Sequence, residues 1–112
     1  MQKIAIPVDE NGILDAHFGH CKYFVLAQIE NGSVMKTEKI LAPPHEPGLL
    51  PPWLAERSVT DIIAGGMGQR AIDLFIQQKI YVYVGAPKIE ANELIEKFLK
   101  EEIPFTSNLC DH

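Results

Sequence analysis

The feature that most constrains the fold is a strand, a glycine loop and a helix in direct succession, followed by a second strand. Residues 60–64 (TDIIA) form a short apolar run suited to a strand that is buried on both faces. Residues 69–78 place apolar side chains on one side at helical spacing. Residues 80–84 (IYVYV) are rich in β-branched and aromatic side chains. Two strands around one helix form a βαβ unit, which predicts a parallel pair with a right-handed crossover.

The loop between them, Gly65-Gly66-Met67-Gly68, allows two interpretations. Glycines leave the backbone N–H groups at the start of a helix uncovered, and this terminus carries roughly half a positive charge, so it suits an anion. Glycine is also what a tight turn from strand to helix needs, and the loop alone favours this simpler interpretation. Neither the dinucleotide-binding glycine pattern nor the Walker pattern is complete.

The first part of the chain predicts three further strands. Residues 3–8 form the first, and residues 23–30 and 33–41 form a pair joined by Asn31-Gly32. Asn-Gly between two strand-like runs is the strongest short hairpin signal and indicates a type I′ turn. Residues 33–41 mix charged and apolar side chains, which predicts one solvent-exposed face.

Prolines and helical spacing organise the remaining segments. Residues 42–52 contain five of the eight prolines, so we expect an ordered loop there rather than a regular helix or a central strand. Pro52 is expected to occupy the first helical position of a short helix over residues 53–57. A last helix is predicted over residues 90–100, with an apolar stripe that includes Leu94 and Phe98.

These elements together predict one α/β domain that spans residues 1–112. The expected architecture is a mixed five-stranded sheet, with an antiparallel hairpin on one side, the βαβ unit on the other and about three helices over its faces. A chain of 112 residues with 46% hydrophobic residues has the size and composition to build one core.

Composition also limits the class of function. The net charge of −5 argues against a broad nucleic-acid surface, which needs a clustered basic face. No run of about 18 apolar residues occurs, so no transmembrane span is predicted. The N-terminal MQKIAIPVDE begins a strand pattern at once and lacks a signal-peptide pattern, so a cytoplasmic protein is expected.

All four histidines and both cysteines fall outside the predicted strands and helices. Imidazole and thiolate are the ligands that borderline and soft metals prefer. The candidate metal ligands are His17, His20, Cys21, His45, Cys110 and His112. Each one alone has a simpler interpretation, such as a turn cap, a small core residue or part of a frayed tail. The set together favours a metal site, although two thiolates cannot form a four-thiolate iron–sulfur site within one chain.

Carboxylates provide the main candidate for a catalytic site. Asp9, Glu10, Asp15 and Asp61 lie in loops or near strand ends and could gather around Mg²⁺ in a nuclease. Asp61, however, stands early in its strand, away from the glycine loop. No serine is paired with a base in a recognisable pattern. Without a complete catalytic constellation, the sequence predicts that the protein is not an enzyme.

Four segments of the chain carry a family resemblance: KIAIPVDENG, HFGHCKYF, IIAGGMGQRAIDLF and IYVYVGA. In this order they resemble the dinitrogenase iron–molybdenum cofactor biosynthesis family, whose members are accessory or carrier proteins for nitrogenase metal clusters or small stand-alone proteins. The most specific parts are His17-Phe18-Gly19 and the glycine loop. HEPGLLPPWL paired with a terminal NLCDH is similar to one small branch of the family. The resemblance implies a ribonuclease-H-like α/β fold, which does not imply nuclease activity.

The resemblance implies that His17 lies at a cluster-facing pocket beside the glycine loop. His20, Cys21 and the tail are not shared by the whole family, so their role depends on their chemistry alone. The candidate residues for holding the cluster without direct metal coordination are Phe18, Gly19, Gly65, Gly66, Gly68 and Arg70. Arg70 would add a charged donor one turn into the helix, and the tail with Cys110 and His112 would close over the site.

The resulting hypothesis is a non-catalytic protein that binds and carries a metal ion or a preformed cluster containing iron–sulfur or molybdenum. Donor and acceptor proteins for the cluster are the expected partners, without nucleic acid or membrane, and the chain is expected to be a monomer or a weak homodimer. One alternative is a simple Zn²⁺ or Cu⁺ site built from the same residues. Another is a metal-free protein-interaction or regulatory domain with structural histidines.

Overall fold

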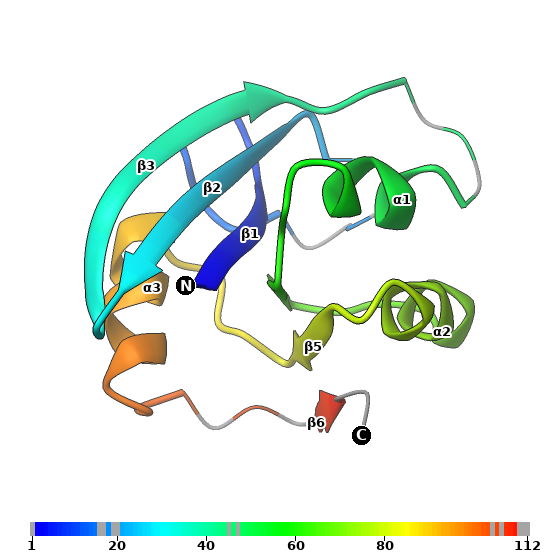
Figure 1. Ribbon diagram of the computed structural model, residues 1–112. Helices are drawn as coiled ribbons and strands as arrows, with labels where there is room; N and C mark the ends of the chain where they lie inside the picture. Colours follow the sequence, from blue (N-terminus) through cyan, green and yellow to red (C-terminus); the bar gives the residue numbers. More distant parts are fainter. Residues whose placement is uncertain are drawn as a thin grey trace.

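The structure is a computed structural model, and it describes residues 2–15, 18, 21–44, 46, 48–103, 105 and 107–109 (Figure 1). The strands within these residues are β1 (Gln2–Val8), β2 (Tyr23–Glu30), β3 (Ser33–Leu41), β4 (Asp61–Ala64), β5 (Tyr81–Val84) and β6 (Ser107–Leu109). The helices are α1 (Leu50–Ala55), α2 (Gln69–Gln77) and α3 (Ala91–Leu99). No helix in this part of the chain is long and apolar enough to cross a membrane.

The strands form one mixed sheet in the order β3-β2-β1-β4-β5-β6. β1 lies inside the sheet, antiparallel to β2 and parallel to β4, and β5 continues the parallel part beside β4. All five predicted strands are present, and the βαβ unit is parallel as expected. The tail adds a sixth short strand that was not predicted, because Ser107–Leu109 pairs antiparallel with β5. The α/β class is thus confirmed, and the ribonuclease-H-like assignment stays a prediction.

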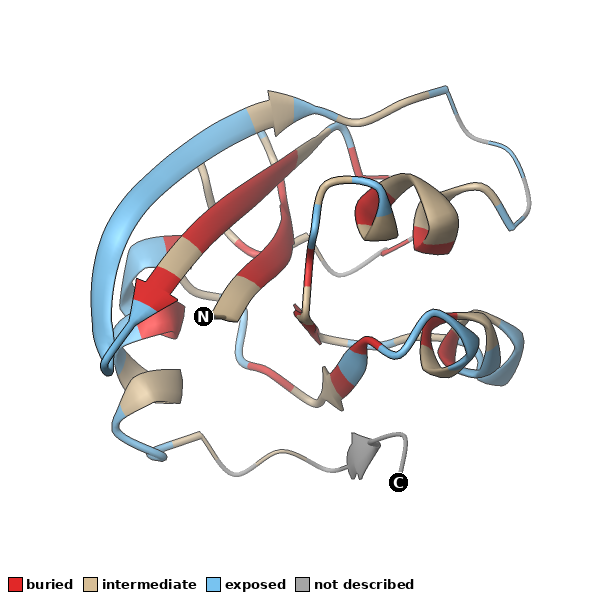
Figure 2. Cartoon of the chain, viewed as in Figure 1, coloured by how far each residue is buried: buried red, intermediate tan, exposed pale blue. Residues whose placement is uncertain are grey.

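Helices cover both faces of the sheet. α1 and α2 pack on one face, where Leu54 and Phe75 are fully buried, and α3 packs on the other, where Leu94 is fully buried. Figure 2 shows the buried residues concentrated in β1 and β2 and on the inner sides of the helices. Each fully buried side chain of this size contributes about 1.5–3 kcal/mol. The two apolar faces of one sheet therefore hold the three layers together.

The hairpin of β2 and β3 has the predicted turn. Asn31 and Gly32 have φ angles of 53° and 76°, and two consecutive positive values are what a type I′ turn requires. The prediction of one solvent-exposed face for residues 33–41 is wrong, because every residue of β3 except Ile40 is exposed, on both faces. The physical reason is its position: β3 is an edge strand at the outer rim of the sheet, visible as the long blue arrow in Figure 2.

The first helix begins earlier than the prolines suggested. α1 starts at Leu50, so Pro51 and Pro52 both lie inside its first turn, and it ends at Ala55 rather than at residue 57. Proline is tolerated there because first-turn N–H groups have no partner four residues earlier. Ser58, at φ 65°, ends this segment. The bounds of β2 and β3 are as predicted, and those of the other predicted helices and strands differ from the structure by one residue at one or both ends.

Candidate functional site

The carboxyl ends of the three parallel strands meet at one edge of the sheet. The loops that follow β1, β4 and β5 therefore lie together, at the edge where open α/β sheets generally bind ligands. Gly85 N–H donates to the Gly65 carbonyl over 3.0 Å, and Ala86 N–H donates to the Ala64 carbonyl over 3.2 Å. These two bonds fix the glycine loop against the loop after β5.

The glycine loop ends at the N-terminus of α2. Gly68 is the N-cap in an extended conformation, without a side chain that caps the helix. The first intrahelical bond runs from Ile72 N–H to the Gly68 carbonyl. The N–H groups of the first turn have no intrahelical acceptor, and they carry the positive end of the helix dipole. This terminus can therefore hold an anion through backbone donors.

Gly66 and Gly68 are exposed, and neither adopts the left-handed conformation that requires glycine. A Cβ atom built on either one would meet no other atom within 4 Å. At Gly65 a Cβ would make only ordinary contacts, with Leu14 Cδ2 at 3.5 Å and the Ala86 carbonyl oxygen at 3.7 Å. The backbone geometry of the turn thus does not account for Gly66 and Gly68, whereas close approach of a ligand to the backbone would.

Side chains around α2 add charge and apolar support. Arg70 is exposed in the first turn of α2. Gln69 Nε2 donates to Asp73 Oδ1 over 2.9 Å on the exposed face of this helix. Met67, inside the loop, is half-buried and packs on the core cluster that contains Phe75. Met67 was not among the predicted site residues, because its packing on the core depends on residues distant in the sequence.

The segment before β2 contributes two buried candidates. Phe18 packs against Phe24 and Phe75, with ring centroids 6.3 and 5.5 Å apart. Cys21 is a free thiol, 9% exposed, in the same core cluster. Burial, reinforced by the charge of Asp15 and partly offset by a backbone hydrogen bond, raises the pKa of Cys21 to about 12. The thiol is therefore protonated at neutral pH, as fits the small core residue that was the simpler interpretation.

The other predicted site residues, namely His17, Gly19, His20, His45, Cys110 and His112, lie outside the described residues. Within the part of the chain that the structure describes, no three side chains among histidine, cysteine, aspartate and glutamate form a group that could hold a metal ion. The backbone of the glycine loop, rather than a set of side-chain ligands, is thus the arrangement that the described residues bring together.

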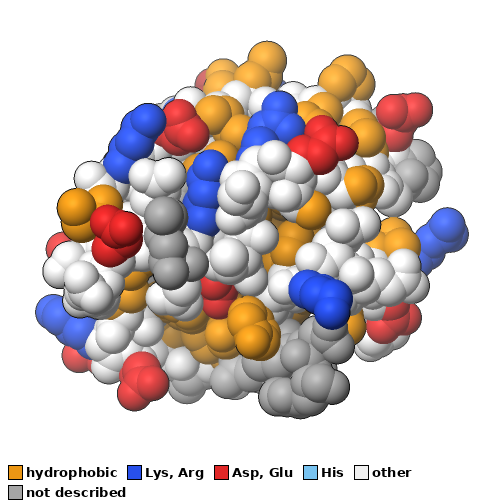
Figure 3. Space-filling model, viewed as in Figure 1, with side chains coloured by type: hydrophobic (Ala, Val, Ile, Leu, Met, Phe, Trp, Pro, Cys, Tyr) orange, Lys and Arg blue, Asp and Glu red, His pale blue; other side chains and the backbone are white. Residues whose placement is uncertain are grey.

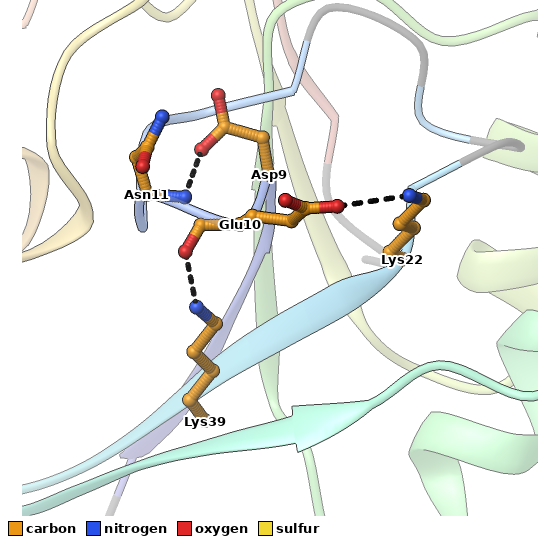
Figure 4. Close-up of polar contacts among 5 residues, drawn as sticks. All are labelled: Asp9, Glu10, Asn11, Lys22 and Lys39. Carbon is orange, nitrogen blue, oxygen red and sulfur yellow. Dashed lines mark hydrogen bonds and ion pairs between the residues drawn. The ribbon is translucent and has the colours of Figure 1, made fainter.

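The acidic loop after β1 is occupied by structural contacts (Figure 4). Asp9 Oδ1 accepts hydrogen bonds from the N–H groups of Asn11 and Ile13. Glu10 forms an ion pair with Lys22 over 2.9 Å, both exposed, and its carbonyl accepts a bond from Lys39 Nζ over 2.8 Å. An exposed ion pair of this kind contributes little to stability.

Asp61 lies at the start of β4, at the opposite edge of the sheet from Asp9. The carboxylates considered for a magnesium-dependent nuclease are therefore split between two edges. Leu14 and Ala86 lie beside Gly65, and this placement was not predicted, because it joins segments far apart in the sequence.

Comparisons with known proteins agree with this arrangement. The family model described as dinitrogenase iron-molybdenum cofactor matches residues 1–101. The uncharacterized protein MJ0580 of Methanocaldococcus jannaschii is 32% identical over 109 residues, which cover 92% of this chain and 90% of that protein.

Two solved structures show the same fold. The crystal structure of PH0822 has a TM-score of 0.85 and 28% identity, and the match covers 94% of this chain and 95% of that one. The apo form of the orange protein from Desulfovibrio gigas has a TM-score of 0.79 at 20% identity, covering 96% and 95% of the two chains. The match over residues 1–101 leads to one conclusion. The chain belongs to the dinitrogenase iron-molybdenum cofactor family.

Proposed function

We propose that the protein binds and carries an anionic metal–sulfur cluster, or a metal ion, at the glycine loop and does not catalyse a reaction. The observation that supports this proposal is the exposed pair Gly66 and Gly68, where the fold does not require glycine and a Cβ would occupy the space in front of the backbone. Membership of a cofactor-related accessory family points to the same class of cargo.

The chemistry of the described residues suits an anion better than a bare cation. Backbone N–H groups at the start of α2 and the guanidinium of Arg70 are donors, and donors of this kind bind negative charge. A cluster with net negative charge would fit this cradle. Direct metal ligands would have to come from His17, His20, Cys21 or the tail, and Cys21 would first have to lose its proton.

A carrier must also release its cargo, and hydrogen bonds from backbone groups break more readily than metal–thiolate bonds. We therefore propose that donor and acceptor proteins exchange the cluster at this edge of the sheet. A monomer or a weak homodimer in the cytoplasm remains the expected working form.

Anaerobic purification with elemental analysis tests the proposal. Coloured protein that contains iron or molybdenum together with sulfide would support it. Colourless protein with stoichiometric zinc or copper would support the simple metal site instead. Protein that stays colourless and metal-free after incubation with tetrathiomolybdate, an anionic metal–sulfur complex, and with iron and sulfide would contradict both, and would favour the interaction domain.

A further inference from the structure

A hollow lies on the α3 face of the sheet, beside β5. It has a volume of about 460 Å³, and its wall is formed by Gln2, Tyr83, Phe98, Leu99, Glu101, Ile103 and Phe105. These residues come from β1, β5, the end of α3 and the segment before β6. Figure 3 shows hydrophobic side chains gathered in the lower part of its view. The volume is within the usual range for small-molecule sites, roughly 300–1,000 Å³.

Three aromatic rings form the apolar wall. Tyr83 lies 5.0 Å from Phe98 and 5.3 Å from Phe105, measured between ring centroids, and Phe98 and Phe105 are 6.1 Å apart. All three side chains are only partly buried. Aromatic rings have a negative face, which attracts cations as well as apolar groups.

The wall of the hollow carries one negative charge among its described side chains. Glu101, exposed, is the only charged residue among the described side chains of the wall. It follows the C-terminus of α3, where the carbonyl groups carry the negative end of the helix dipole. Lys97 and Lys100, in the last turn and at the C-cap of α3, do not line the hollow. An anionic ligand would therefore meet repulsion here.

A buried carboxyl group lies directly behind the wall. Asp61 is 2% exposed and accepts hydrogen bonds from Thr60 Oγ1 and, over 3.4 Å, from Gln2 Nε2. A hydrogen bond with the Tyr83 side chain also favours its charged form, but burial outweighs these bonds and raises the pKa of Asp61. Within the described residues none of its contacts is with a lysine or an arginine.

We propose that this hollow binds a small organic cation, an ammonium group carried on an apolar or aromatic body. The apolar body lies against Phe98 and Phe105, and the ammonium group lies between Glu101 and the Gln2–Tyr83 side that covers Asp61. The cation supplies the positive charge that the buried carboxyl group lacks. Its wall contains no residue of the glycine loop or of α2, so it does not depend on the proposed function.

The test compares two ligands of nearly equal shape and opposite charge. Phenethylammonium and hydrocinnamate are titrated separately into the full-length protein, and amide chemical shifts are followed by NMR. Phenethylammonium should shift the amide signals of Tyr83, Leu99 and Glu101 and bind at least about tenfold more tightly than hydrocinnamate, as like-charge repulsion predicts. Equal affinity for the two ligands would mean that the hollow is a non-selective apolar surface and would overturn the proposal. Failure of both ligands to bind would also overturn it.

Two variants test whether the carboxyl groups at this site cause the preference for a cation. Glu101→Gln should weaken phenethylammonium binding by about twofold to fivefold, as expected for an exposed ion pair. Asp61→Asn should weaken it further, because the buried charge is less screened. Glu93→Gln, an exposed change in the first turn of α3, is the matched control and should leave the affinity unchanged. Unchanged affinity in Glu101→Gln and Asp61→Asn, with folding verified by circular dichroism, would overturn the proposal.

Discussion

At Gly66 and Gly68 an added methyl group would meet no protein atom, and neither backbone is left-handed. Alanine at such positions lowers the entropy of the unfolded chain and typically stabilises a protein by about 0.4–1 kcal/mol. We therefore expect Gly66→Ala to keep or raise the melting temperature while it weakens binding of tetrathiomolybdate; Gly68 is the N-cap of α2, where alanine is disfavoured, and is left unchanged. Thermal unfolding and a spectrophotometric titration measure the two effects.

Gly85 supplies the control for a glycine that the backbone needs. It has a φ of 93°, so Gly85→Ala should lower the free energy of unfolding by about 1–2 kcal/mol. If Gly66→Ala destabilised the fold to the same degree as Gly85→Ala, the glycine loop would serve the turn alone.

Asp61 predicts a pH dependence of stability. Burial raises its pKa in the folded state above the ordinary 3.8, so the folded protein holds this proton more tightly than the unfolded chain. The stabilisation of the folded state by this tighter proton binding is fully present at pH values below the pKa of Asp61 in the unfolded chain. It is lost as the pH rises through the pKa of Asp61 in the folded protein. An asparagine at position 61 cannot ionise. In urea unfolding, the free energy of unfolding of Asp61→Asn minus that of the native protein should therefore increase from about pH 4 toward neutral pH. A constant difference across this range would contradict the prediction.

At single residues, local spacing along the chain and packing between distant segments determine different features. The glycine loop could be located from its spacing, because local order along the chain determines which residues follow a strand and begin a helix. The burial of Cys21 and Asp61 could not be predicted, because it depends on side chains from distant segments that pack around them. For Cys21 alone a core residue was the simpler interpretation and only the whole set of ligands favoured a metal site, and the structure places its thiol in an apolar cluster.

At the scale of elements, the hairpin is the most local feature, and its turn and its strand bounds were predicted, whereas the irregular register between Gln28 and Ile29 was not. Both strands have the expected bounds because Asn31-Gly32 determines the turn type and the turn determines the register. α1 was predicted less well, because proline excludes a helix interior but not a first turn. β6 was missed, since a three-residue strand carries too little pattern to be seen without its partner β5.

Asn31→Pro tests the hairpin directly. Proline fixes φ near −65°, whereas Asn31 has a φ of 53°, so the substitution should cost about 1–3 kcal/mol and lower the melting temperature. Asn31→Gly is the matched control and should leave the melting temperature nearly unchanged, because glycine accepts a positive φ. A melting temperature in Asn31→Pro equal to that of the control would contradict the turn assignment.

At the scale of the whole molecule, the tail connects stability with the candidate metal site. The chain pairs with β5 as far as Leu109, so a truncation that leaves the sheet intact must remove residues 110–112 only. We predict that this truncation lowers the affinity for zinc, because it removes Cys110 and His112, and that urea unfolding of the metal-free protein stays unchanged.

Zinc binding by the full chain should weaken as pH falls through about 6.5, where an unperturbed imidazole gains its proton. The double substitution Cys110→Ser with His112→Ala is the control that keeps the chain length. Full zinc affinity in the truncated chain would limit any metal site to the other candidate residues. Loss of folding instead would make the tail a structural element.

The parallel pairing of β1 with β4 also has a consequence for synthesis of the chain. Lys3 N–H donates to Thr60 Oγ1 across 57 residues of sequence, so the apolar strand β1 gains its second neighbour only after β4 has left the ribosome. The β1–β2–β3 meander can form earlier, because its contacts are local. Until β4 arrives, one edge of an almost wholly apolar strand stays unpaired, and such an edge is the part of a nascent chain that chaperones protect from aggregation.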